Sequence, residues 1–248
     1  MLTLGAVINI LFPSACPVCK NDSDGFLHAP FCASCWAKIE PYKGPACPVC
    51  GEPAVSGHAS VCGHCIKNKQ PFTKVFFYGI YDGVLKEAIH RFKFCGTRRL
   101  GNPLGAFLLQ AVLERTTMQN IDCIVPVPMH KTGLIERGFN QTAALAAVIS
   151  EKTGTPLLNN ALVKNRITRP QYELDRDERQ KNLKGAFSSS GTINGLRVLL
   201  VDDVVTTGAT VRECAKTLRK KGAADVCIAA LARSSVNASG PVLIRTDF

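Results

Sequence analysis

The chain has 248 residues, enough for one large domain or two smaller ones, and its 46% hydrophobic and 20% charged residues are ordinary for a soluble protein. The formal net charge of +11 favours anionic partners such as phosphates, nucleic acid or an acidic membrane surface. No segment is long enough to span a bilayer, and no basic residue precedes the apolar run at 1–16, so a signal peptide is disfavoured. We therefore expect a cytoplasmic protein whose twelve cysteines ligate metal rather than form disulfides.

Eight of these cysteines form four CxxC pairs at near-equal spacing. They are Cys16 and Cys19, Cys32 and Cys35, Cys47 and Cys50, and Cys62 and Cys65. Four thiolates complete a tetrahedral shell around zinc and leave no open position, so we expect two structural Zn²⁺ sites. A redox motif, an iron–sulfur cluster or reduced core thiols explain the regular spacing less well. Pairing of consecutive CxxC motifs closes the shorter loops, but the sequence leaves interleaved pairing open.

Residues 1–70 are predicted to form a small domain that depends on this metal. The segment has few large apolar residues, so zinc binding should drive its folding. Two Zn(Cys)₄ sites would each carry about −2, which lowers the net charge of the zinc-loaded chain to about +7. The zinc-bearing segment itself becomes mildly acidic, and we assign no nucleic-acid binding to it alone.

From residue 71 onwards, apolar runs alternate with helical patterns. We expect strands at 75–82, 121–128, 197–204 and 224–232, and helices at 83–94, 100–115, 140–154 and from Thr210. Alternating strands and helices predict a parallel sheet with helices on both faces. In such sheets, ligands bind beyond the carboxyl ends of the strands.

One predicted strand leads directly into two acidic residues. Asp202 and Asp203 follow four apolar residues, which places them at the carboxyl edge of a buried strand. The loop after them consists of Thr206, Thr207, Gly208, Ala209 and Thr210. Backbone amides and hydroxyls in such a loop can surround a phosphate, helped by the dipole of the next helix. Because carboxylates accept hydrogen bonds from sugar hydroxyls, the pattern predicts a sugar-phosphate site. A Walker loop is excluded because the chain has no Gly-Lys-Ser/Thr.

Three further segments carry charge near the predicted sheet. The loop at 130–138 places Lys131 and Arg137 beyond a strand, which favours an anion site over a solvated basic loop. Residues 164–187 are highly charged, as expected of a solvated segment or a flexible lid. Residues 90–101 interleave basic residues with Phe92 and Phe94; these rings either stack on bases of a single strand or are buried in a helix. The remaining cysteines, Cys95, Cys123, Cys214 and Cys227, are expected to be core thiols.

The segment VLLVDDVVTTGAT at 198–210 resembles the phosphoribosyl pyrophosphate (PRPP) signature of type I phosphoribosyltransferases. The order of CxxC pairs, VPVPMHKTGLIERGFNQ, RPQYELDRDERQKNLKGAF and this signature resembles the ComF family of phosphoribosyltransferase-like proteins over nearly the whole chain. The resemblance implies an α/β fold: a type I phosphoribosyltransferase-like parallel-sheet domain at 71–248, preceded by a double zinc ribbon at 1–70.

The resemblance also implies roles for individual residues. Asp202 and Asp203 would contact the ribose hydroxyls, the loop at 206–210 would hold the 5-phosphate, and Lys131 and Arg137 would face the pyrophosphate, with Mg²⁺ accompanying PRPP. The segment at 164–187 would be the lid of the fold. Within it, residues that match the family pattern are Gln171, Arg179 and Asn182.

Two functions follow from the resemblance. The first is a PRPP-binding protein of DNA uptake and natural transformation, which handles incoming single-stranded DNA beside the uptake machinery. The alternative is an active phosphoribosyltransferase, a pentosyltransferase of nucleotide salvage. Purine-type transferases carry an aspartate base where this chain has Thr206, so the loop is more similar to the orotate type. No segment identifies an acceptor, and the sequence leaves catalytic turnover open.

Overall fold

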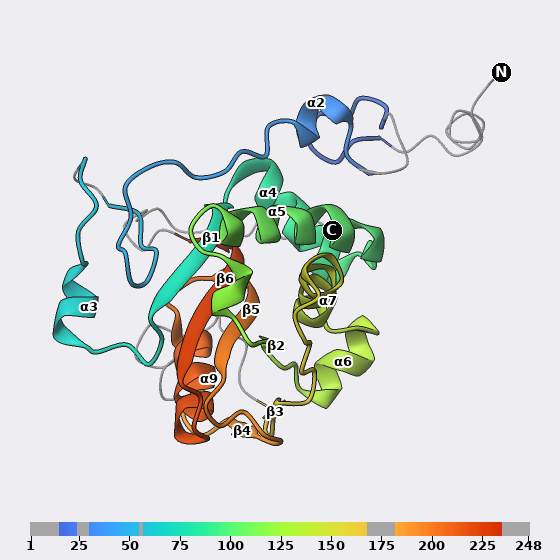
Figure 1. Cartoon of the computed structure of the whole chain (residues 1–248). Helices are drawn as coiled ribbons and strands as arrows, with labels where there is room; N and C mark the ends of the chain where they lie inside the picture. The colour runs from blue at the N-terminus through green and yellow to red at the C-terminus, as the bar shows by residue number, and fades with distance from the viewer. Residues whose placement is uncertain (1–14, 24–29, 55–56, 168–181, 235–248) are drawn as a thin grey trace.

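A four-stranded parallel sheet forms the centre of the computed structural model, which describes residues 15–23, 30–54, 57–167 and 182–234 (Figure 1). The strand order is β1-β6-β5-β2, and each neighbouring pair is parallel. The strands are β1 (Lys74–Ile80), β2 (Cys123–Pro126), β5 (Arg197–Val205) and β6 (Asp225–Arg233). All carboxyl ends therefore meet at one edge of the sheet.

Two apolar cores lie on opposite faces of this sheet, because successive strand residues point to opposite sides. On β5, Leu199 and Val201 join one core, while Val198 and Leu200 join the other. Helices α4 (Gly83–Phe94), α5 (Gly101–Leu113) and α7 (Gln141–Thr153) cover the first face. Helix α9 (Ala209–Lys220) and the antiparallel pair β3 (Leu162–Lys164) and β4 (Phe187–Ser189) cover the second.

The remaining elements are short. They are α2 (Ala33–Trp36), α3 (Gly63–Lys67), the 3₁₀ turns η1 (Arg98–Leu100) and η2 (Met118–Asn120), and α6 (Lys131–Arg137). Among the residues that the structure describes, no helix combines the length and apolarity needed to cross a membrane.

The sequence pattern located the main strands and helices correctly, and the predicted fold class, a parallel α/β sheet preceded by a cysteine-rich ribbon, is confirmed. Two predictions were incomplete. Residues 131–137, expected as a loop, form α6, which begins where the His130 ring accepts a hydrogen bond from the Thr132 amide and ends at Gly138. Gly138 has φ of +72°, a conformation that glycine adopts without strain. The β3–β4 pair had no counterpart among the predicted elements.

The apolar side chains of the first ribbon pack onto the sheet domain. Phe31 and Trp36 are buried, and both belong to the core under α5. The Trp36 ring stacks on Phe107 with centroids 5.6 Å apart, and Phe107 stacks in turn on Tyr78 of β1 at 4.5 Å. The ribbon therefore buries its few apolar side chains against the α/β core rather than in a core of its own.

Candidate functional site

Asp202 and Asp203 lie inside β5, close to its carboxyl end. The strand continues past them to Val205, one residue beyond the predicted range of 197–204. Pairing with β6 carries the strand further, through Val204 opposite Ala232 and Val205 opposite Arg233. Both carboxylates are buried, with 8% and 4% of their surface exposed. They point to opposite faces of the sheet because side chains alternate along a strand.

Asp203 is held by two side chains from the helices on its face. Its Oδ1 lies 2.7 Å from the Nζ of Lys93, at the end of α4. Its Oδ2 accepts a hydrogen bond of 2.8 Å from the Nε2 of Gln141, the first residue of α7. The Oε1 of Gln141 is buried and has no hydrogen-bond partner among the described residues. The cluster thus contains a buried ion pair and one acceptor available to a donor.

Asp202 faces the other core. Its Oδ1 accepts a hydrogen bond of 2.8 Å from the backbone amide of Asp203. Burial raises the pKa of Asp202 to about 7, and the charge of Asp203 adds to this effect, while Lys93 and the amide hydrogen bond oppose it. The raised pKa favours the protonated form of this carboxyl group, which can donate as well as accept a hydrogen bond.

The predicted phosphate loop follows β5 and leads into α9. Gly208 is the residue before the helix and has φ of +74°, which explains why glycine stands there. Because glycine has no side chain to cap the helix, the first amides of α9 carry the positive end of its dipole without a capping oxygen from that residue. Within the loop, the Ala209 amide lies 3.4 Å from the Oγ1 of Thr207.

The predicted pyrophosphate residues lie on α6, which follows β2. Since β2 and β5 are neighbours and parallel, α6 and the loop at 206–210 emerge at the same edge of the sheet. Lys131 is exposed at the first residue of α6. Arg137 places its guanidinium 4.5 Å from the centre of the Phe94 ring on α4. The structure thus brings Arg137 next to Phe94, the neighbour of Lys93 in sequence.

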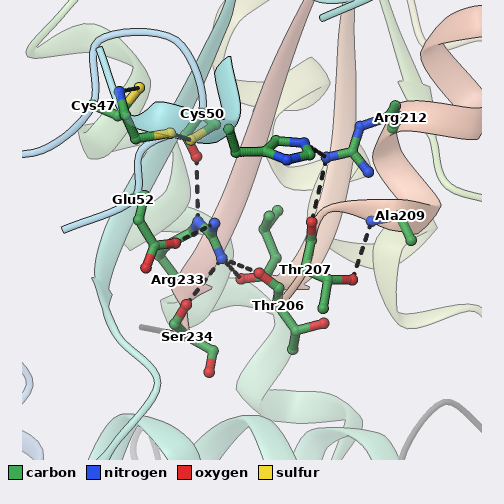
Figure 2. A network of polar contacts seen from close by, with 12 residues as sticks. Cys47, Cys50, Glu52, Thr206, Thr207, Ala209, Arg212, Arg233 and Ser234 are labelled. Carbon is green, nitrogen blue, oxygen red and sulfur yellow. Dashed lines mark hydrogen bonds and ion pairs between the residues drawn. The ribbon is translucent and has the colours of Figure 1, made fainter. Parts of the chain in front are cut away.

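The loop at 206–210 contacts the second zinc ribbon through Arg233, as Figure 2 shows. Arg233 ends β6 and is buried, with 4% of its surface exposed. Its Nη1 donates to the carbonyl oxygens of Val205, at 2.8 Å, and Thr206. Its Nη2 lies 2.5 Å from the carboxylate of Glu52, and its Nε donates to the carbonyl of Cys50 at 3.2 Å.

A second arginine joins the same two parts of the chain. Arg212 of α9 lies 3.1 Å from the Nε2 of His64 on α3, and donates to the carbonyl of Thr207 at 3.4 Å. A cavity of about 210 Å³ separates the ribbon from the loop and is lined by both arginines, His64 and Gly208. These contacts were not predicted from the sequence; the one available signal is Arg233, a charged residue at the end of an apolar run.

The eight ribbon cysteines form two clusters from consecutive CxxC pairs. The first contains Cys16, Cys19, Cys32 and Cys35, and the second contains Cys47, Cys50, Cys62 and Cys65. Within each cluster, the four Sγ atoms lie within 4.8 Å of one another. Sulfurs bound at about 2.3 Å to one zinc ion are about 3.8 Å apart, so both clusters fit a tetrahedral site. The structure decides between the pairings that the sequence left open.

Backbone hydrogen bonds lower the pKa of the first cysteine of each ribbon. Burial raises the pKa of Cys16, but hydrogen bonds from the backbone of Cys19, Cys32 and Val18 outweigh it and lower the pKa to about 6. Burial also raises the pKa of Cys47, but hydrogen bonds from the backbone of Cys50, Cys62 and Val49 outweigh it and lower the pKa to about 7. Because metal binding requires deprotonated thiols, these turns favour zinc.

Other predictions have mixed outcomes. Cys123 and Cys214 are buried as expected and Cys227 is half-buried, but Cys95 is exposed because it follows the last turn of α4, so its prediction as a core thiol was wrong. Phe92 is fully buried, whereas Phe94 is 59% exposed. Gln171 and Arg179 lie outside the described residues, as does most of the predicted lid. Asn182 is described, and its carbonyl accepts a hydrogen bond from Arg166.

Comparison with known families matches both parts of the chain. Residues 7–66 match the family described as a double zinc ribbon domain, and residues 142–242 match the phosphoribosyl transferase domain.

The chain is similar to known proteins over most of its length. It is 33% identical over 226 residues to the DNA utilization protein YhgH of Salmonella typhi, covering 90% of this chain and 98% of that protein. It is 34% identical over 209 residues to competence protein F of Haemophilus influenzae, covering 82% and 90%. Competence protein ComFC of Bacillus subtilis is 31% identical over 212 residues, covering 82% and 84%. The similarity therefore includes both the ribbons and the α/β sheet.

The two clusters predict that the purified protein holds two zinc ions per chain. Replacing Cys16 and Cys19 by serine should remove one zinc ion, and replacing Cys47 and Cys50 should remove the other, because each pair supplies half of one cluster. Metal analysis by mass spectrometry measures the content. Retention of both ions by either variant would show that the replaced cysteine pair does not ligate zinc.

The raised pKa of Asp202 predicts a stability cost above neutral pH. Since the unfolded carboxyl ionises near its ordinary pKa of 3.8 and the folded one near 7, the free energy of unfolding falls as pH rises between these values. The Asp202→Asn variant should therefore unfold at a higher temperature than wild type at pH 8, and this gain should shrink toward pH 5.5.

Asp122→Asn is the matched control for this thermal-unfolding series. Hydrogen bonds from Arg197 lower the pKa of Asp122 to about 2, so its charge stabilises the folded state above that pH. This variant should be less stable than wild type at pH 8, the opposite sign. An Asp202→Asn variant that is no more stable than wild type at pH 8 would show that the buried charge carries no cost.

Proposed function

The chain belongs to the ComF family of competence proteins, and on that basis we propose that it binds PRPP and handles incoming single-stranded DNA in the cytoplasm during DNA uptake. The observation that carries the PRPP half of the proposal is the pair of buried carboxylates on β5, one turn of loop before a helix whose N-cap residue, Gly208, has no side chain. A buried acidic pair of this kind costs stability, and a ligand that donates hydrogen bonds to it would explain why it is there.

In this proposal, ribose hydroxyls donate to Asp202 and Asp203 while the 5-phosphate accepts from the amides of the loop at 206–210. The Nζ of Lys93 and the amide of Gln141 now occupy Asp203. An incoming hydroxyl would replace one of these contacts, and Lys93 would then be available to the pyrophosphate, together with Lys131 and Arg137. The unpartnered Oε1 of Gln141 offers a further acceptor for a sugar hydroxyl.

The Mg²⁺ ion that the family resemblance implies would enter with the pyrophosphate and neutralise part of its charge. Carboxylate oxygens are suitable magnesium ligands, and Asp202 and Asp203 are the carboxylates at this edge of β5. The contribution of the chain itself is to orient the ribose, to surround the phosphate with amides and to place cations beside the leaving group.

An active phosphoribosyltransferase is the alternative within the same site. A carboxyl group with a pKa of about 7, as for Asp202, can exchange a proton with the acceptor substrate of such an enzyme at neutral pH. Release of pyrophosphate from PRPP in the presence of individual nucleobases measures turnover directly, and it distinguishes an enzyme from a protein that only binds PRPP.

Calorimetric titration of the zinc-loaded protein with PRPP and Mg²⁺ tests the PRPP half. Replacing both carboxylates by amides, in an Asp202→Asn/Asp203→Asn variant, should weaken binding at least about tenfold, because each hydrogen bond to a charged group contributes about 1.5–3 kcal/mol. The control is Asp122→Asn. Asp122 precedes β2 and pairs with Arg197 at the opposite end of β5, so this variant should bind as wild type does. Absence of binding by wild type, or equal binding by the double variant, would refute the proposal.

An exposed aromatic ring among cations supports the DNA half. Phe94 is 59% exposed, with the Arg137 guanidinium 4.5 Å from its centre and the His90 ring 5.1 Å away. Lys93, in the same turn of α4, belongs to the candidate PRPP site. Rings and guanidinium planes stack on unpaired bases, and nearby cations attract the phosphate backbone. This surface therefore lies where a single strand would come close to the bound phosphosugar.

Binding of an oligothymidylate measured by fluorescence anisotropy tests this surface. Phe94→Ala should weaken binding several-fold, since stacking contributes about 1–3 kcal/mol per base, and wild-type affinity should fall as salt rises. Ile66→Ala is the control, because Ile66 is 72% exposed but lies on α3 of the second ribbon. Salt-independent binding, or equal losses in both variants, would exclude a role for this surface.

A further inference from the structure

The contacts of Arg233 and Arg212 fix the direction of three successive peptide groups in the loop. The carbonyls of Val205 and Thr206 accept from Arg233, and that of Thr207 from Arg212. In a trans peptide the carbonyl and the next amide point in opposite directions. The amides of residues 206, 207 and 208 are therefore turned away from the two arginines. Successive amides on one side of a loop form an anion-binding concavity, and this one ends at the left-handed Gly208.

Arg233 itself is held by the second zinc ribbon. Its guanidinium is almost fully buried, and a charge in that position requires a close partner. Glu52 supplies it at 2.5 Å, with 12% of its side chain exposed. The carbonyl of Glu52 accepts a hydrogen bond of 2.8 Å from the amide of Cys47, so Glu52 belongs to the zinc-binding turn itself. The carbonyl of Cys50, a further ligand, accepts from the Nε of Arg233.

We propose that the second zinc ribbon is part of the phosphate site: Arg233 is a positioning residue that turns the amides of the loop at 206–208 toward the 5-phosphate, and Glu52 holds Arg233 in place (Figure 2). This inference rests on the proposed binding of PRPP. It assigns to the ribbon a role in phosphosugar affinity, beyond folding and beyond any contact with DNA. Glu52 and Arg233 lie 181 residues apart in sequence, so the pair joins the second zinc ribbon to the end of β6.

The Glu52→Gln variant tests the proposal because it keeps the shape of the side chain and removes its charge. In the zinc-loaded protein, its affinity for ribose 5-phosphate should fall about tenfold or more, since a hydrogen-bonded charge is lost. Its affinity for inorganic pyrophosphate, which the loop does not bind in this account, should stay within about twofold of wild type. Hydrogen exchange of amides 206–208 should become faster, while exchange in β2 and α7 should not change.

Asp122→Asn is the matched control, because it breaks an ion pair at the other end of β5 that does not touch the ribbon. A Glu52→Gln variant with wild-type exchange and wild-type ribose 5-phosphate affinity would overturn the inference. Equal weakening of ribose 5-phosphate and pyrophosphate, with faster exchange across the whole sheet, would also overturn it, because it indicates general destabilisation. If wild type binds neither PRPP nor ribose 5-phosphate, the proposed function fails, and the exchange of amides 206–208 alone decides whether Arg233 orders the loop.

A second variant covers the case in which Glu52→Gln loses zinc or fails to fold. Arg212→Gln leaves the buried Glu52–Arg233 pair in place and removes the donor to the Thr207 carbonyl. It should accelerate exchange of the Gly208 amide and weaken ribose 5-phosphate several-fold, again without affecting pyrophosphate. No change in either measurement would contradict the proposal.

Discussion

Two adjacent carboxylates buried on β5, an inner strand of the sheet, are the constraint that the candidate site depends on. Asp203 is stable there because α4 and α7 bring Lys93 and Gln141 to it from one face of the sheet. Asp202, on the other face, has the amide of Asp203 as a hydrogen-bond donor, and its pKa rises to about 7. An apolar pair at these positions would cost nothing in desolvation. The arrangement costs stability, and in the proposed function it offers acceptors and a cation to a polyhydroxylated, phosphorylated ligand.

The zinc ribbons are integrated with this site rather than appended to it. The first ribbon buries Trp36 against Phe107 in the core below α5. The second lies beside the loop at 206–210 and supplies Glu52 to a buried arginine that this loop also contacts. Since a small cysteine-rich segment takes its shape from its metal, the zinc-bound turn around Cys47 and Cys50 sets where that carboxylate stands. Metal binding in one part of the chain is thereby connected to backbone geometry in the other.

Local pattern was sufficient for much of this structure and insufficient for its long-range contacts. Alternation of apolar runs and helical periodicity located the four strands of the sheet, and CxxC spacing identified all eight cysteines that form the clusters. The acidic pair and the glycine before α9 were recognisable because both are local departures from a buried strand. The pairing of the clusters and the partners of Asp203 and Arg233 depend on residues 12 to 181 positions apart, which no local pattern specifies. Helix α6 was not predicted because its seven residues show no apolar periodicity. Its ends are set by the His130 cap and by Gly138.

A crystal structure of the zinc-loaded chain with PRPP and Mg²⁺ would test the central claim most directly, because it locates the ligand against the carboxylates. We predict the ribose hydroxyls within hydrogen-bond distance of Asp202 and Asp203, the 5-phosphate on the amides of the loop at 206–210, and the Nζ of Lys93 moved from Asp203 to the pyrophosphate. PRPP bound elsewhere, with the 2.7 Å contact between Lys93 and Asp203 unchanged, would contradict the account and assign the buried acidic pair a purely structural role.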